Sequence, residues 1–88
     1  MQFDGAVIEE QNVVFGIVIV RPHVLRDPAQ QRQMQSFGAR VFGAIPIVLM
    51  AQDSRGIPTY YGRSDIVDFL RGVPVEAIPW RQYTVHAA

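Results

Sequence analysis

The sequence predicts an α+β fold over residues 1–88: a two-layer sandwich of ββαββα order, with a mixed sheet of four to five strands and two helices on one face. Three observations predict it. Residues 45–51 form a short apolar run between breakers and are apolar at both sets of alternate positions, as in a strand covered on both faces. Residues 13–20 are dense in β-branched side chains, which favour strands. Between these two runs, residues 27–43 have helical periodicity.

The N-terminal half predicts a β-hairpin followed by a helix. Residues 6–9 and 13–20 are its strands, and the polar residues 10–12 turn the chain. The connection at residues 21–26 begins extended, because Arg21 precedes a proline. Asp27 and Pro28 are typical of a helix start, and Gly43 is a natural stop. The apolar stripe of this helix consists of Met34, Phe37, Gly38, Val41 and Phe42.

The second half predicts a hairpin, a helix and a short extension. Residues 53–56 have the composition of a tight turn, and residues 57–61 form an edge strand because Pro58 cannot donate a ladder hydrogen bond. Ser64 caps a helix over residues 65–71. Residues 74–78 predict one helical turn, and residues 80–85 predict a last strand. The first helix is long enough to cross the sheet, so the two central strands are expected to be parallel.

Composition excludes several kinds of chemistry. The chain has no cysteine, which removes disulfides, thiolate metal sites and cysteine nucleophiles. All its basic residues are arginine, which removes lysine Schiff bases and the P-loop lysine. Its two histidines, His23 and His86, are far apart and form no metal motif. We therefore expect no metal and no cofactor.

The sequence contains no segment that favours a membrane or export. Its longest uncharged apolar run, residues 13–20, is too short to span a bilayer. Asp4, Glu9 and Glu10 occupy the positions where a signal peptide needs basic and apolar residues. The prediction is a soluble cytoplasmic protein with no membrane partner.

Residues 44–50, followed by a turn, a strand and a helix, resemble the second half of a thioredoxin-like domain. In that family an Ile-Pro step with a cis proline opens a central strand, and Ile45-Pro46 stands at that place here. The resemblance covers residues 14–72 in element order and implies a truncated thioredoxin-like topology. Redox activity is not carried over, because the chain has no Cys-x-x-Cys motif and lacks the first strand–helix unit.

The first candidate site lies where the two central strands end. Ligands of open sheets tend to bind beyond the carboxyl ends of parallel strands. That edge would collect the ligand-binding candidates, which are Arg21, His23, Gln52, Asp53 and Arg55. They could bind a small anion, and a small enzyme would use His23 and Asp53, with Arg21, to move a proton. The alternative is structural, because Asp53 and Arg55 belong to a turn and His23 follows a proline in a loop.

The second candidate site is an aromatic and basic cluster. Tyr60 and Tyr61 are adjacent on a strand, so they point to opposite faces and one of them is expected to be exposed. Together with Arg55 and Arg63, they could stack on nucleic-acid bases. The alternative is an amphipathic edge strand with one tyrosine in the core. The chain has eight basic and eight acidic residues, and this balance argues against nucleic acid as a partner.

The function that the sequence favours is a non-catalytic interaction or ligand-binding module that self-associates. Two helices on one face would leave the other apolar face of the sheet uncovered, and a large uncovered patch usually marks an interface. We therefore expect a homodimer with Trp80 at or near the contact. The other interface candidates are Tyr60, Tyr61 and Tyr83.

Overall fold

A computed structural model of the chain describes residues 1–86. The elements follow in the order β1 (Gln2–Glu10), β2 (Val13–Ile19), the 3-10 helix η1 (Pro22–Arg26), α1 (Pro28–Phe42), β3 (Ile47–Gln52), β4 (Pro58–Tyr61), α2 (Ser64–Arg71), the 3-10 helix η2 (Val75–Ala77) and β5 (Arg81–Thr84). The predicted α+β class, the ββαββα order and the short last strand are confirmed. No helix within residues 1–86 is both long and apolar enough to span a membrane.

The five strands form one mixed sheet in the order β4-β3-β2-β1-β5. β2 and β3 are parallel and joined by the crossover through η1 and α1, as predicted, while the other neighbouring pairs are antiparallel. β4 lies at one edge, as Pro58 indicated, and β5 lies at the other. The β1–β2 hairpin turns at Gln11 and Asn12, both at positive φ, which is the geometry of the two-residue hairpin turn that matches strand twist.

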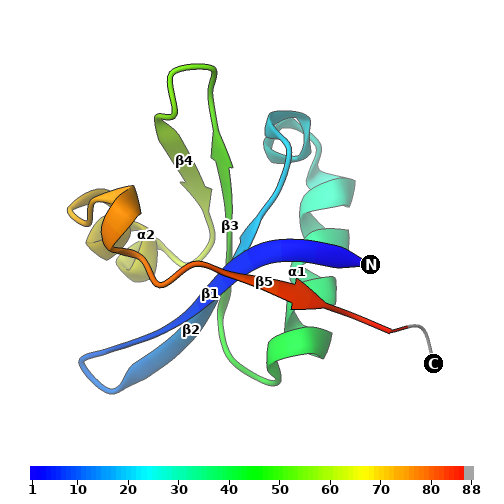
Figure 1. Cartoon of the computed structure of the whole chain (residues 1–88), viewed down its shortest axis with the longest axis horizontal. Helices are drawn as coiled ribbons and strands as arrows, with labels where there is room; N and C mark the ends of the chain where they lie inside the picture. Colours follow the sequence, from blue (N-terminus) through cyan, green and yellow to red (C-terminus); the bar gives the residue numbers. More distant parts are fainter. Residues whose placement is uncertain (87–88) are drawn as a thin grey trace.

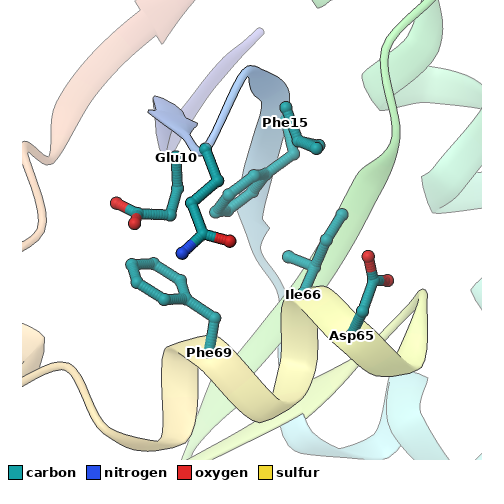
Figure 2. Close-up of a pocket in the computed structure, with 7 residues that line it drawn as sticks. Glu10, Phe15, Asp65, Ile66 and Phe69 are labelled. Atoms are coloured by element: carbon teal, nitrogen blue, oxygen red, sulfur yellow. The ribbon is translucent and has the colours of Figure 1, made fainter.

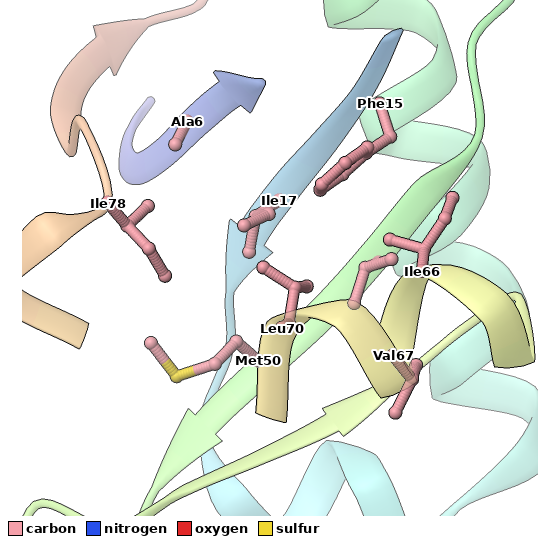
Figure 3. Close-up of a cluster of buried hydrophobic side chains, with 9 residues drawn as sticks. Ala6, Phe15, Ile17, Met50, Ile66, Val67, Leu70 and Ile78 are labelled. Carbon is pink, nitrogen blue, oxygen red and sulfur yellow. The ribbon is translucent and has the colours of Figure 1, made fainter. Parts of the chain in front are cut away.

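The two helices lie on opposite faces of the sheet, so the prediction that both cover one face is wrong (Figure 1). Helix α1 packs on one face, where Met34 and Phe42 join a cluster built on Val18, Ile47 and Leu49. Helix α2 packs on the other face of the sheet (Figure 3). There its buried residues join the strand side chains that alternate with those facing α1. That second cluster contains Ala6, Phe15, Ile17, Val48, Met50, Ile66, Val67, Leu70 and Ile78.

This arrangement follows from the sheet's two apolar faces. Side chains alternate along β3, so Leu49 and Met50 point to opposite faces, and both are fully buried. After β4 the chain passes close to the start of β3 at Gly62, where a Cβ atom would lie 2.9 Å from a methyl group of Val48. The chain thereby reaches the face that α1 leaves open, and α2 covers it. The uncovered sheet face on which we based the predicted homodimer is therefore absent.

Helix α1 approaches the sheet closely through its predicted apolar stripe. A Cβ atom at Gly38 would lie 2.7 Å from Ile47, so only glycine permits this distance. Two residues differ from the expected pattern. Gln31 is buried, although it is polar and does not belong to the predicted apolar stripe, and its Nε2 donates a 2.8 Å hydrogen bond to the Leu25 carbonyl. Phe37 is half-buried and packs edge-on against Phe3 at a ring distance of 5.2 Å.

Candidate functional site

The parallel pairing of β2 and β3 brings the two predicted loops to the same end of the sheet. Arg21 and His23 follow β2, while Asp53 and Arg55 follow β3. The side chains of His23 and Asp53 line two different hollows. Arg21 and His23 line a hollow of about 580 Å³ beside the N-terminal strand. Asp53 lines a separate hollow of about 320 Å³, formed with η1 and β4.

Asp53 and Gln52 have a structural role in the β3–β4 turn. The Oδ1 atom of Asp53 accepts hydrogen bonds from the backbone N–H groups of Arg55, at 2.8 Å, and Ile57, at 2.9 Å. The Nε2 atom of Gln52 donates to the Gly56 carbonyl at 3.0 Å. This geometry matches the structural alternative for Asp53. Arg55 is exposed beside it, and the use of these residues for anion binding or catalysis stays a prediction.

Arg26 lines the same hollow as Gln52 and Asp53, although it was not among the predicted site residues. The connection begins extended at Arg21, as predicted. It then coils into η1, in which the Asp27 N–H donates a 3.2 Å hydrogen bond to the Val24 carbonyl. The coil buries Val24, and Arg26 lines the hollow beside β3 and β4. The sequence signal for a packed turn was Val24, an apolar residue two positions after Pro22.

Tyr60 and Tyr61 point to opposite faces, as expected for neighbours on a strand. Tyr61 is 43% exposed, whereas Tyr60 packs against the α2-side cluster. The Tyr60 hydroxyl is buried without a hydrogen-bond partner in residues 1–86, and burial raises the pKa of this hydroxyl. Arg63 is held by Asp65 through two hydrogen bonds of 2.7 and 2.8 Å. Tyr61 and Arg55 are exposed, and Arg63 is exposed but paired with Asp65. The nucleic-acid hypothesis stays a prediction.

Of the remaining interface candidates, Trp80 directly precedes β5 and Tyr83 lies within it. Trp80 is half-buried and donates from Nε1 to the Val75 carbonyl at 2.9 Å. Tyr83 stacks on Phe3 at a ring distance of 5.3 Å and meets Phe42 edge-on at 5.0 Å. These contacts fix the side chains of the edge strand from within the same chain.

The backbone of β5 is paired on one side only. Met1 and Val85 exchange two hydrogen bonds, from the Met1 amine to the Val85 carbonyl at 2.9 Å and from the Val85 N–H to the Met1 carbonyl at 2.7 Å. Hydrogen-bonded pairs alternate along an antiparallel ladder, so Phe3 and Tyr83 form the next bonded pair. The N–H and C=O groups of Gln82 and Thr84 therefore point outward.

A further pocket, which the sequence analysis missed, lies between the tip of the β1–β2 hairpin and α2 (Figure 2). It encloses about 190 Å³ and is lined by Glu10, Gln11, Val13, Phe15, Asp65, Ile66 and Phe69. Glu10 was predicted to lie in the turn. It is instead the last residue of β1, paired with Val13, because the turn needs only two residues.

No group of three or more His, Cys, Asp or Glu side chains within residues 1–86 is arranged to hold a metal ion. Comparison of the chain with protein-family models, curated proteins and solved structures finds no match. The thioredoxin-like resemblance thus rests on Ile45 and Pro46 and on element order. The peptide bond before Pro46 is not cis, since residues 1–86 contain no cis peptide bond.

Proposed function

We propose that this chain is a non-catalytic interaction module that forms a homodimer, with the outer edge of β5 as the contact between two copies. The open edge carries the proposal: β5 ends the sheet, and the backbone groups of Gln82 and Thr84 point away from β1. An edge strand with unpaired N–H and C=O groups is a template for another strand. The open edge takes the place of the uncovered sheet face as the support for self-association.

Of the two sheet edges, β5 is the less protected. Natural proteins protect edges with short strands, proline, bulges and charged side chains. Both edge strands have four residues, so they differ in the other features. β4 contains Pro58, which has no N–H to offer a partner strand. β5 has no proline, and its register with β1 runs without a bulge from Gly5↔Arg81 to Gln2↔Thr84. Its one charged residue, Arg81, stands at the start of the strand. These differences favour β5 as the contact.

Antiparallel pairing of two β5 strands is self-complementary about Tyr83. With Tyr83 opposite its own copy, Gln82 of each chain faces Thr84 of the other, so the outward N–H and C=O groups of both residues find partners. Arg81 would then face Val85 rather than a second arginine, which avoids a like-charge pair. A two-fold axis of this kind is the commonest symmetry of homo-oligomers.

The side chains around β5 add apolar surface to such a contact. Tyr83 belongs to an aromatic group with Phe3 and Phe42. A hollow of about 530 Å³ lies beside the strand and is lined by Phe37, Arg40, Val41, Thr84, Val85 and His86. A pairing through one short strand belongs with small interfaces, below roughly 1,200 Å² in total, which are typically weak. We therefore expect a reversible dimer.

Sedimentation equilibrium over a wide range of protein concentration tests the proposal. The wild-type chain should change from monomer to dimer as its concentration rises. Gln82→Pro removes an outward N–H that the monomer does not use and should remain monomeric throughout, while the matched control Gln82→Ala keeps the N–H and should dimerise. Circular dichroism checks folding, and Thr84→Pro replaces Gln82→Pro if the latter unfolds. A wild-type chain that is monomeric at every concentration contradicts the proposal, as does a folded proline variant that dimerises normally.

A further inference from the structure

The pocket between the hairpin tip and α2 combines apolar walls with a few polar groups, as small-ligand sites commonly do. The rings of Phe15 and Phe69 meet edge-on at 6.4 Å beneath it, and Ile66 adds an aliphatic surface. The ionisable residues that line it are Glu10 and Asp65, both acidic, and no lining residue is basic. The walls therefore suit a carbon chain, and the charge suits a cation.

The two carboxylates differ in what neutralises them. Asp65 lies in the first turn of α2, where the helix dipole favours negative charge, and Arg63 bonds to both of its carboxylate oxygens. Glu10 is half-buried and makes no ion pair within residues 1–86. In the view of Figure 2, Glu10 and Phe69 lie toward one side of the pocket and Asp65 toward the other. A carboxylate without an ion-pair partner in residues 1–86 and an aromatic ring therefore line the same pocket.

We infer that this pocket binds an alkylammonium group, with the positive charge between the Glu10 carboxylate and the Phe69 ring. An ammonium within about 6 Å of a ring centroid is attracted by the negative face of the ring, and the carboxylate adds an ion pair. The carbon chain lies against Phe15 and Ile66, where it loses contact with water. The volume of about 190 Å³ admits a short chain, such as a lysine side chain or a free amine of similar length. None of these residues belongs to β5, so the inference does not depend on the dimer.

Titration of isotope-labelled protein with n-butylammonium, followed by backbone amide chemical shifts, tests the inference. Shifts should be confined to the hairpin tip and the first turns of α2. The neutral analogue n-butanol should bind more weakly, because it lacks the positive charge that pairs with Glu10. The anion butyrate should not bind, because its negative charge is repelled by Glu10. Equal binding of n-butanol and n-butylammonium overturns the inference, as does the absence of any saturable shift with n-butylammonium.

Glu10 and Glu9 form a matched pair for mutation. They are adjacent on β1, so Glu9 points to the other face of the hairpin, where it is exposed opposite Val14. Glu10→Gln should weaken n-butylammonium binding about fivefold, as expected for a partly exposed ion pair, and leave n-butanol binding unchanged. Glu9→Gln should leave both unchanged. Equal weakening of n-butylammonium binding by the two variants overturns the inference, because the effect would then arise from net charge alone.

A blocked Gly-Lys-Gly peptide distinguishes the two sources of the alkylammonium group. Tighter binding of the peptide than of n-butylammonium assigns the pocket to a lysine side chain of another protein. Tighter binding of n-butylammonium assigns it to a free amine. Failure of both to bind contradicts the inference.

Discussion

Leu49 is the residue at which truncation should destabilise the chain most directly. It is fully buried at the centre of the α1-side cluster, on the strand that neighbours both β2 and β4. Leu49→Ala should lower the free energy of unfolding by about 2–5 kcal/mol, as typical core truncations do. Urea unfolding followed by circular dichroism measures this. The control Val7→Ala, at a side chain that is 41% exposed, should change the free energy by less than about 0.5 kcal/mol. An unchanged unfolding midpoint for Leu49→Ala would show that this packing is misassigned.

The burial of a single residue was predictable where apolar side chains recur at regular positions along the chain. It was not predictable where it depends on a contact with one particular residue of another element. The run at residues 45–51 indicated that Leu49 and Met50 are both buried, and both are. Gln31 resembles a surface residue by type, yet it lies one turn before Met34 and two turns before Gly38, on the inner side of α1. Its burial depends on the Leu25 carbonyl, which only the coiled η1 places within reach. Helical periodicity alone does not predict the hydrogen bond between Gln31 and Leu25.

Helix α2 should lose stability in acid through its first turn. Hydrogen bonds from Arg63 lower the pKa of Asp65 from 3.8 to about 2. Because the folded pKa lies below the ordinary value, this contribution is complete above the ordinary pKa and is lost as the pH falls through the folded one. Asp65→Asn should therefore flatten the fall of the unfolding midpoint between about pH 4 and pH 2. Both side chains are exposed, so added salt should reduce the effect.

The matched control for this prediction is Asp68→Asn, one turn further along the same helix. Asp68 contacts Arg71 through one hydrogen bond of 3.1 Å. Asp68→Asn should therefore leave more of the fall of the unfolding midpoint in acid than Asp65→Asn does. The same slope in the wild type and in Asp65→Asn would contradict the role of the Arg63–Asp65 pair.

Among the elements, type and order were predictable, and the ends of the hairpin were not. Asp27 predicted the start of α1 correctly, and its Oδ1 accepts from the Ala29 and Gln30 N–H groups. The polar residues 10–12 indicated a turn without showing its length. The tight turn at Gln11 and Asn12 keeps Glu10 in the strand. From there the side chain of Glu10 lines the pocket beside α2. Neither Gln11 nor Asn12 is glycine, the usual marker of this turn.

For the whole molecule, the sequence indicated a sheet with two apolar faces but not which helix covers which face. The alternation along β3 is the same whether α2 lies beside α1 or opposite to it. The path through Gly62, close against β3, takes the chain to the second face, and that close approach is a tertiary contact. Since one helix covers each face, the proposed self-association uses the edge of the sheet, at β5.

Hydrogen exchange along β5 tests this claim most directly. The amides of Arg81 and Tyr83 face β1 within the chain, whereas those of Gln82 and Thr84 face outward. Exchange should be followed by NMR in a dilute and in a concentrated sample. We predict that Gln82 and Thr84 exchange rapidly when dilute and become protected when concentrated, while Arg81 and Tyr83 are protected to a similar degree in both. Rapid exchange of Gln82 and Thr84 at every concentration would contradict pairing of two chains through this edge.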